Sequence, residues 1–463
     1  MAFDSNPEPD LISEELPEEF LTREQETEPA LQKPEDHPED GPQLNWLFVD
    51  MNSYFASVEQ DARPELRGLP LAVVPMMADT TCCIAASYEA KAFGVKTGTI
   101  VGDAKRLCPG IELVEARHQL YVEYHHRIVE AVESCLPVTA VMSVDEMACR
   151  LMGRERPLLA AMELGRKVKR SILERVGPMM RSSVGLATNR YLAKVASDME
   201  KPDGLVALTL DILPYALRQL KLRDLPGIGA QMEKRLNEQG IRTMDDLLAL
   251  DCEGTGQVWG SVLGERLNHW LRGEDFEMDE TEHLKSMSHQ HVLAPEMRTP
   301  EQAWAVAHKL LHKAAMRLRA SNLWASSIGL AIGFAVPRSE NKPVSRFGTP
   351  TKGWKSEIRL SECQDNATLI AALSRLWASR PAGAEYDKPY FIGVHLNGLV
   401  PDRLHTLNLF EGTEEEQNRT RLVAAMDALN NKYGMSTLAP ATMLTAFKAA
   451  PTRIAFHTIP EQF

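Results

Sequence analysis

The chain has 463 residues, of which 44% are hydrophobic and 25% charged, as in an ordinary globular protein with room for about three domains. It contains no apolar run of about 18 residues and no basic, apolar leader after Met1, which argues against a membrane span and against secretion. Its seven cysteines form no CxxC pair, so we expect free thiols and a cytoplasmic location.

The net charge of −13 arises almost entirely in the N-terminal segment 1–43. This segment holds 14 Asp and Glu residues against Arg23 and Lys33, and it contains seven prolines. Such a composition predicts an acidic, disordered tail. The rest of the chain carries 49 basic and 50 acidic residues, so its charge does not exclude a nucleic-acid partner.

From Leu44 onwards the apolar pattern predicts strands and helices in a defined order. They are a strand at 47–50, a helix from 54, a helix over 122–136, strands at 139–144 and 147–151, a helix over 158–176, a strand at 182–187 and a helix over 191–197. The order strand, helix, strand, strand, helix, strand indicates a ferredoxin-like unit. Its first and third elements are expected to be the two central strands.

Four further parts of the chain differ in composition and pattern from this unit. Segment 62–121 interrupts the first unit and is predicted to be a small inserted subdomain, because glycine and proline punctuate it. Residues 202–281 are expected to form a short helical domain, and 285–400 a second mixed unit of strands and helices. Residues 401–463 are expected to follow as a less regular tail.

Three acids stand at the ends of predicted strands: Asp50, and the adjacent pair Asp145 and Glu146. A buried carboxylate is costly unless a cation neutralises it, and divalent ions do this well. If the two strands are neighbours in one sheet, the acids converge on a metal site suited to phosphoryl transfer. The alternative is that the strand-end acids face water separately.

Five groups of motifs follow one another in the chain. They are 50–59 (DMNSYFASVE), 87–96 (SYEAKAFGVK), 143–146 (SVDE), 184–198 (VGLATNRYLAKVASD) with 201–204 (KPDG), and 225–229 (LPGIG). Together they resemble the Y-family translesion DNA polymerases, strongly from about residue 46 to 250 and more weakly to about 400. The resemblance implies an α+β, right-hand polymerase. Its parts would be a ferredoxin-like palm (44–61 and 122–201), small fingers (62–121), a helical thumb with a helix-hairpin-helix (202–281) and an α/β little finger (285–400).

The resemblance further implies template-directed synthesis from deoxynucleoside triphosphates on primer-template DNA. Asp50, Asp145 and Glu146 would hold two Mg²⁺ ions, with the carbonyl of Met51 as a further ligand. One ion would activate the primer 3′-hydroxyl, and the other would bind the triphosphate. The small fingers imply loose enclosure of the nascent pair and hence low-fidelity translesion synthesis in DNA damage tolerance.

The nucleotide contacts implied by the resemblance are Tyr54, Phe55, Tyr88, Lys91 and Lys194. Phe55 matches the aromatic steric gate under the sugar, where a ring leaves no room for a 2′-hydroxyl; the alternative is an ordinary core aromatic. Tyr88, Lys91 and Lys194 match contacts to the triphosphate. Lys91 stands where the family usually has arginine. This puts tight binding of the nucleotide in doubt, because lysine offers a point charge instead of a bidentate fork.

Two other motifs predict binding surfaces. Pro226, Gly227, Ile228 and Gly229 resemble a helix-hairpin-helix turn whose backbone N–H groups face DNA phosphates, or else form a plain interhelical turn. The peptide 406–410 (TLNLF) resembles the one that docks bacterial polymerases on the sliding clamp, with threonine in place of the usual glutamine. Its clamp-binding side chains would be Leu407, Leu409 and Phe410. The alternative is a loop packed against the little finger.

Two other classes of function fit parts of the sequence. One is a catalytically silent DNA-binding scaffold subunit of a mutagenesis complex, and retention of the three acids and of Phe55 argues against it. The other is a nucleotide cyclase or another two-metal enzyme with a ferredoxin-like palm. The LPGIG turn and the mixed unit at 285–400 argue against that alternative, because a cyclase has no use for duplex DNA.

Overall fold

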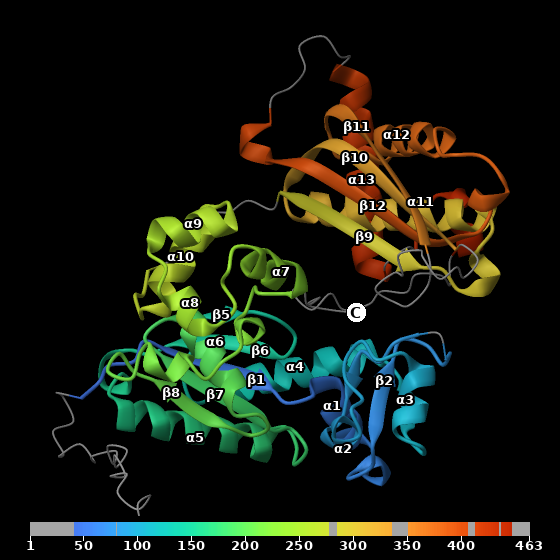
Figure 1. Ribbon diagram of the computed structural model, residues 1–463. Coiled ribbons are helices and arrows are strands. Elements are labelled where there is room, and N and C mark those ends of the chain that lie inside the picture. The colour runs from blue at the N-terminus through green and yellow to red at the C-terminus, as the bar shows by residue number, and fades with distance from the viewer. Residues whose placement is uncertain are drawn as a thin grey trace, which may run out of the picture. The chain divides into compact units, whose positions relative to one another are not determined.

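The computed structural model describes residues 41–79, 81–276, 285–335, 351–405, 413–434 and 437–446. These residues form three sheets with their covering helices and a run of helices between the second and third α/β parts of the chain, as the α+β prediction requires (Figure 1). Within these ranges, none of the helices combines the length and the apolar character that a membrane span needs. Short 3-10 helices lie in the connections: η2 (Pro64–Leu66), η3 (Gly153–Glu155), η4 (Tyr215–Leu217), η5 (Leu222–Asp224), η6 (Pro295–Met297), η7 (Ala384–Tyr386), η8 (Asp402–Leu404) and η9 (Ala441–Ala446).

A five-stranded sheet carries the predicted palm. β1 (Trp46–Met51) is paired antiparallel with β6 (Glu146–Arg150) on one side and β7 (Ser182–Ala187) on the other. β5 (Ala140–Val141) extends the sheet beyond β6, and β8 (Leu205–Leu208) extends it beyond β7, giving the order β5-β6-β1-β7-β8. All six residues of β1 are buried, which accounts for the continuous apolar run in this segment.

Helices cover both faces of this sheet. Val49 of β1 belongs to a hydrophobic core that also contains residues of α4 (His118–Glu133) and α5 (Leu158–Arg175). Phe48 alternates to the opposite face and packs in a second core with α6 (Arg190–Met199). The central strand is therefore screened from water on both sides, and its last residues open into the cavity described below.

The predicted order of strands and helices is confirmed, but the predicted place of 139–144 is wrong. Only Ala140–Val141 of this segment form a strand, and that strand lies at the sheet edge. A tight turn joins β5 to β6, and the two strands pair with each other. The other edge of β6 pairs with β1, so β6 and not β5 is the neighbour of β1. The segment 202–281, predicted to be helical, likewise begins with a strand, because β8 pairs parallel with β7.

The predicted fingers segment holds a small sheet and two short helices: β2 (Leu71–Val74), β3 (Ala85–Ala86), β4 (Glu112–Glu115), α2 (Tyr88–Ala92) and α3 (Val101–Leu107). β2 pairs antiparallel with β3 and parallel with β4. These elements have a small hydrophobic core of their own. The helix that follows β1, α1 (Tyr54–Ala62), contacts β2 and β3 and so connects this sheet with the palm.

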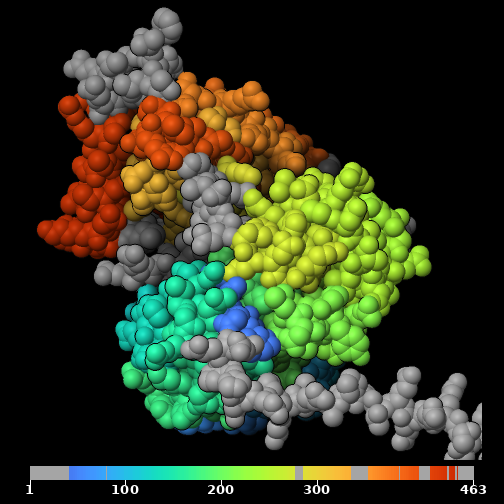
Figure 2. All heavy atoms as spheres, turned by 90° about the vertical axis from the view of Figure 1, so that its left-hand side faces the viewer, coloured from blue at the N-terminus to red at the C-terminus, as the bar shows by residue number. Residues whose placement is uncertain are grey.

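Four helices follow β8 in the predicted thumb: α7 (Ala230–Glu238), α8 (Met244–Leu248), α9 (Cys252–Trp259) and α10 (Val262–Leu271). Thr243 caps α8 and Asp251 caps α9, each through a hydrogen bond from a backbone N–H to the side chain. Leu236 and Leu267 share the hydrophobic core of α6. The thumb helices, yellow-green in Figure 2, accordingly lie against the green palm residues.

The unit at 285–400 is a mixture of strands and helices, as the sequence predicts: β9 (Ser286–Val292), α11 (Pro300–Ala320), β10 (Leu323–Ala335), β11 (Thr351–Cys363), α12 (Asn366–Ala378) and β12 (Pro389–Pro401). Its four strands form an antiparallel sheet in the order β11-β10-β12-β9. The two helices pack on this sheet and share one hydrophobic core with it.

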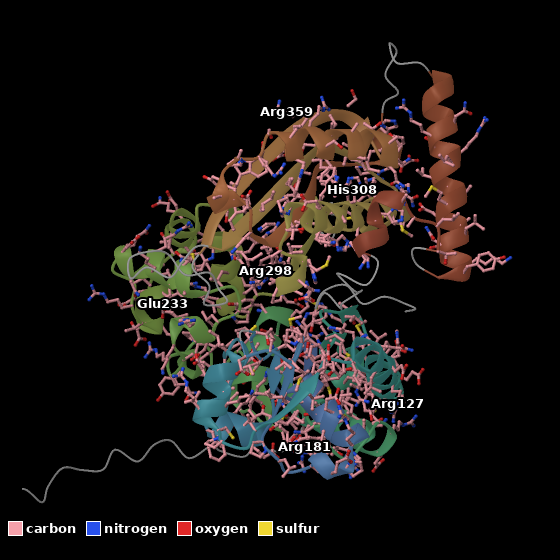
Figure 3. The ribbon with its side chains drawn as sticks, turned by 90° about the vertical axis from the view of Figure 1, so that its right-hand side faces the viewer. Arg127, Arg181, Glu233, Arg298, His308 and Arg359 are labelled. Carbon is pink, nitrogen blue, oxygen red and sulfur yellow. The ribbon has the colours of Figure 1, made fainter. Side chains whose placement is uncertain are left out.

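The expectation of a less regular tail after residue 400 is wrong for the described part. α13 (Thr413–Tyr433) is a long helix, and Arg319 of α11 forms an ion pair with its Asp427, with 2.6 Å between Nε and Oδ2. His308, labelled in Figure 3, lies on the side of α11 that contacts η9. Its Nδ1 forms a hydrogen bond with the Thr442 hydroxyl at 2.9 Å. Residues of α13 and η9 thus complete the little-finger unit, through these polar contacts and through Ala446 of η9, which is buried in its hydrophobic core.

We expect Gly185→Ala to destabilise the palm. A Cβ at this position in β7 would overlap the carbonyl oxygen of Ala193 and the N–H of Ser197, both in the backbone of α6. Because helix backbone cannot give way locally, α6 must move off the sheet, at a cost of about 3 kcal/mol in the free energy of unfolding. Urea unfolding should show this loss beside a Gly353→Ala control, whose Cβ would have no neighbour within 4 Å. Equal midpoints for the two variants would contradict this packing.

Candidate active site

The register of the palm sheet brings the three predicted acids together. Asp50, near the end of β1, lies opposite Glu146, the first residue of β6. Asp145 precedes β6 directly, and its carbonyl oxygen accepts a hydrogen bond from the N–H of Met51 at 2.9 Å. All three acids and Met51 line one cavity of about 270 Å³. The alternative of acids facing water separately therefore does not describe this sheet.

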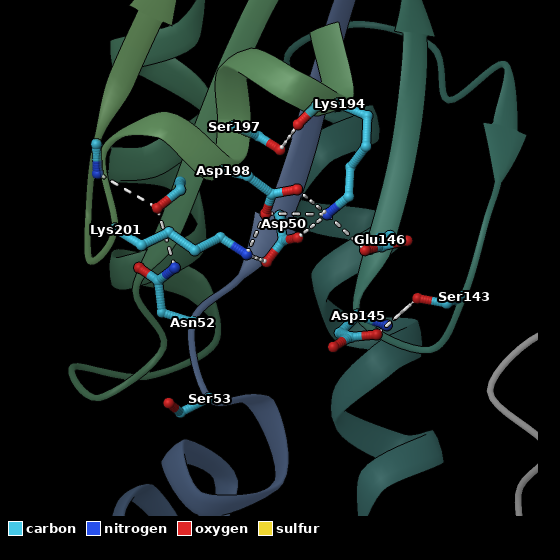
Figure 4. A network of polar contacts seen from close by, with 12 residues as sticks. Asp50, Asn52, Ser53, Ser143, Asp145, Glu146, Lys194, Ser197, Asp198 and Lys201 are labelled. Atoms are coloured by element: carbon cyan, nitrogen blue, oxygen red, sulfur yellow. Dashed lines mark hydrogen bonds and ion pairs between the residues drawn. The ribbon is translucent and has the colours of Figure 1, made fainter. Parts of the chain in front are cut away.

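Two lysines neutralise part of this negative charge (Figure 4). Lys194 of α6 reaches between Asp50 and Glu146 and forms ion pairs with both, at 2.7 Å for Glu146. Lys201 binds Asp50 at 2.7 Å, and both lysines also contact Asp198, at 3.1 Å from Lys194 and 2.7 Å from Lys201. Only 6% of the Asp50 side chain is exposed, so its charge depends on these partners and not on water.

The burial of the acids also shifts their protonation. Burial raises the pKa of Asp145, and the hydrogen bond from Ser143, 2.6 Å long, offsets only part of this effect. Burial likewise raises the pKa of Glu146, against the opposing charge of Lys194. Burial alone would lower the pKa of Lys194, but Asp50, Asp198 and Glu146 outweigh it and raise that pKa, so the ammonium stays charged.

The donor chemistry of this cavity fits divalent cations. Asp50, Asp145 and Glu146 line the cavity and Asp198 binds the lysines beside it, so four carboxylates meet three lysines, Lys91, Lys194 and Lys201, and one carboxylate is in excess. Carboxylate oxygens are the ligands that Mg²⁺ prefers. Within the described residues, no three acidic, histidine or cysteine side chains are arranged as a finished metal site. Figure 4 shows why: Lys194 lies between Asp50 and Glu146, while Asp145 turns towards Ser143.

Of the predicted nucleotide contacts, Lys194 lies among the acids, and the other four lie on the fingers side of the same cavity or next to it. Phe55 and Tyr54 line it from α1, and the Phe55 ring stacks on Tyr121 with 4.3 Å between centroids. Lys91 also lines it, donating to Ser53 at 2.7 Å, and its ammonium lies 4.2 Å from the centre of the Tyr88 ring. The structure thus groups these side chains beside the acids.

Sequence analysis did not include Lys201 or Asp198 among the site residues. Both belong to quoted motifs, and their spacing of three residues at the end of α6 allows the ion pair between them. A lysine one turn beyond an acid is a common surface pattern, so spacing alone does not reveal a buried role. The structure shows their role, because Lys201 forms an ion pair with Asp50 and Asp198 forms one with Lys194.

The LPGIG turn lies on a second, larger cavity between palm and thumb, of about 930 Å³. Gly227 has a φ of 89°, a backbone conformation that favours glycine, and Gly229 precedes the first residue of α7. Pro226 lines this cavity, as do Glu146 and Lys194. One residue of the turn, Pro226, and one of the three acids, Glu146, therefore border the same cavity. The predicted clamp peptide with Leu407, Leu409 and Phe410 lies outside the described residues.

Comparisons with known proteins agree with this geometry. The impB/mucB/samB family profile matches residues 49–198, its C-terminal domain profile matches 284–409, and the profile "DNA polymerase-iota, thumb domain" matches 223–275. DNA polymerase IV of Moorella thermoacetica is 33% identical over 405 residues, covering 86% of this chain and 96% of the relative. DNA polymerase IV of Pelotomaculum thermopropionicum is 30% identical over 406 residues, covering 86% and 95%.

A solved structure, "Y-family DNA polymerase chimera Dbh-Dpo4(243-245)-Dbh", superimposes with a TM-score of 0.60 at 25% identity, covering 77% of this chain and all of that one. The chain belongs to the Y family of DNA polymerases. It is a DNA-directed DNA polymerase of the polymerase IV type, and the predicted right-hand fold is confirmed. For this Y-family polymerase the thumb profile spans the LPGIG turn, and the first profile spans the three acids.

We expect Asp145→Asn to raise the melting temperature of the metal-free polymerase by about 2 °C at neutral pH. Because burial raises the pKa of Asp145 above its ordinary 3.8, the ionised carboxylate costs stability at every pH above its folded-state pKa. Asparagine removes that cost. The gain should shrink as the pH falls towards 4, where the carboxyl itself becomes neutral.

Melting curves in the presence of a chelator, from pH 4 to 8, test this expectation. Glu163→Gln is the matched control, because 66% of the Glu163 side chain is exposed. A gain that persists unchanged at pH 4, or that the control reproduces, would contradict the assigned cause.

Proposed function

We propose that this polymerase carries out Mg²⁺-dependent, low-fidelity translesion synthesis on primer-template DNA. The observation that carries the proposal is the group of three acids, Asp50, Asp145 and Glu146, which line one cavity and which the fold brings together from two neighbouring strands. These residues, with the carbonyl of Met51, would hold two Mg²⁺ ions. When bound, the ions would lower the pKa of the primer 3′-hydroxyl and stabilise charge on the triphosphate.

In this proposal the lysines exchange partners when substrate binds. Lys194 and Lys201 now neutralise Asp50, and cations at the acids would free both ammonium groups for triphosphate oxygens. Lys91, already in the cavity wall, would contribute a third positive charge, with Tyr88 beside it as a hydroxyl donor. Lys194 and Lys201 from the palm and Lys91 from the fingers lie around the acids, so they would orient the triphosphate for in-line attack.

The cavity between palm and thumb is proposed to receive the primer end. Glu146 and Lys194 border both cavities, so a strand in the larger one would present its 3′ end to the acids. At the other side of this space, the backbone N–H groups of the Gly227–Gly229 turn would bind DNA phosphates without reading sequence.

Sugar selection is assigned to Phe55 and low fidelity to the fingers. The buried Phe55 ring forms part of the cavity wall, and a ring in this position leaves no room for a ribose 2′-hydroxyl. The fingers sheet consists of strands of four, two and four residues, a small surface for enclosing a nascent base pair. Loose enclosure tolerates damaged templates, which supports a role in DNA damage tolerance.

Partners and location extend the proposal. A sliding clamp would dock on Leu407, Leu409 and Phe410. The cysteines of the described residues are free thiols, as expected in a reducing cytoplasm. A silent scaffold subunit is disfavoured because the acids remain grouped in one cavity with the lysines.

Asp145→Asn tests the catalytic proposal. We expect this exchange to slow Mg²⁺-dependent primer extension by about 1,000-fold, because it removes a charged ligand that acts on the developing charge. Affinity for primer-template DNA, measured by fluorescence anisotropy, should stay unchanged. Glu163→Gln should extend primers at the full rate. Extension by Asp145→Asn at the rate of the unaltered polymerase would refute the assignment.

A further inference from the structure

A fully buried carboxylate lies one helical turn behind Phe55. Glu59 is four residues further along α1, on the same face of the helix, and its side chain is 0% exposed. Its oxygens accept hydrogen bonds from Arg117 at 2.6 and 3.1 Å, from Arg63 at 2.5 Å and from the Tyr121 hydroxyl at 2.7 Å. We call Glu59, Arg63, Arg117 and Tyr121 the Glu59 brace.

At the centre of the Glu59 brace, both carboxylate oxygens of Glu59 accept hydrogen bonds. Burial alone would raise the pKa of Glu59, but the hydrogen bonds from Arg117, Arg63 and Tyr121 outweigh it, and this pKa lies below its ordinary value. The carboxylate is therefore ionised at neutral pH. A buried ion with several charge-assisted bonds fixes the geometry of its neighbours more strictly than an apolar contact does.

The brace reaches the cavity through two stacked rings. Tyr121, in the first turn of α4, is fully buried, and its ring stacks on Phe55 with an interplanar angle of 16°. Its hydroxyl is held by Glu59, and its carbonyl oxygen accepts a hydrogen bond from the hydroxyl of Tyr54 at 2.6 Å. Tyr121 is therefore held at its hydroxyl by Glu59 and at its backbone carbonyl by Tyr54, and the Phe55 ring stacks on its ring.

We propose that Glu59 is a positioning residue for sugar discrimination, acting through the hydroxyl of Tyr121 on the ring that supports Phe55. The proposal rests on the proposed function, in which Phe55 excludes ribonucleotides. A steric gate discriminates only as far as it resists displacement by the larger sugar. Because Glu59 holds the ring behind the gate, loosening Tyr121 lets Phe55 yield to a 2′-hydroxyl while leaving deoxynucleotides unaffected.

Two conservative exchanges test the brace. Tyr121→Phe keeps the stacked ring and removes only its hydroxyl, whereas Glu59→Gln keeps the side-chain size and removes the charge. The ratio of kcat/KM for a deoxynucleotide to that for the matching ribonucleotide should fall about 3- to 10-fold in each. The change should arise from a lower KM for the ribonucleotide, with deoxynucleotide kinetics nearly unchanged.

Tyr124→Phe is the matched control. It removes the same kind of bond between the same two helices, because the Tyr124 hydroxyl donates to Asp61 at 2.8 Å, but that bond does not involve Glu59. This variant should keep the selectivity of the unaltered polymerase. If it lowers the ratio as far as Tyr121→Phe does, a general loosening of α1 and α4 explains the result and the brace is overturned.

Phe55→Ala separates the brace from the gate. Alone, this exchange should abolish most of the sugar selectivity, and adding Tyr121→Phe to it should cause no further loss. If Phe55→Ala leaves selectivity intact, the gate itself fails. If Phe55→Ala lowers selectivity but neither Tyr121→Phe nor Glu59→Gln does, only the brace fails. Additive losses in the double variant also overturn it, and melting curves identify any Glu59 variant that does not fold, in which case Tyr121→Phe decides.

Discussion

The balance of charge around Asp50 is the interaction on which the rest of this site depends. Its side chain is almost fully buried at the end of a central strand, where it forms ion pairs with Lys194 and Lys201. Glu146 shares Lys194 with it, and Asp145 follows in the adjoining turn. With Asp198, four carboxylates meet the three lysines Lys91, Lys194 and Lys201, so the acids are not fully neutralised and would attract divalent cations.

The surrounding fold holds this balance in place from two sides. On one side Gly185 lets α6 approach β7 closely, which brings Lys194 over the strand that carries Asp50. On the other, Asp275 at the end of the thumb binds the palm through the side chains of Asn45 at 2.9 Å and Arg150 at 2.8 Å. These contacts border the larger cavity, so the space for a primer strand depends on the packing that also positions the acids.

Much of this arrangement could be predicted from the sequence. Asp50 could be placed because a buried strand ending in an acid is a local pattern, and the ordered motifs then supplied the fold and family. The register that sets β6 beside β1 depends on a turn between two short strands, which no single segment specifies. The Glu59 brace joins residues far apart in the chain, and an ion pair between Arg319 and Asp427 links α11 to α13. Neither contact produces a periodic apolar pattern, so neither could be predicted from the sequence.

The central claim is that the acids around Asp50 exchange their lysine partners for metal ions when substrate binds. A crystal structure with primer-template DNA, a non-hydrolysable deoxynucleotide and Mn²⁺ tests it most directly. The account predicts two anomalous peaks at coordination distance, about 2 Å, from oxygens of Asp50, Asp145 and Glu146, with Lys194 no longer between Asp50 and Glu146. Absence of metal at these oxygens, with Lys194 still bridging the two acids, would contradict it.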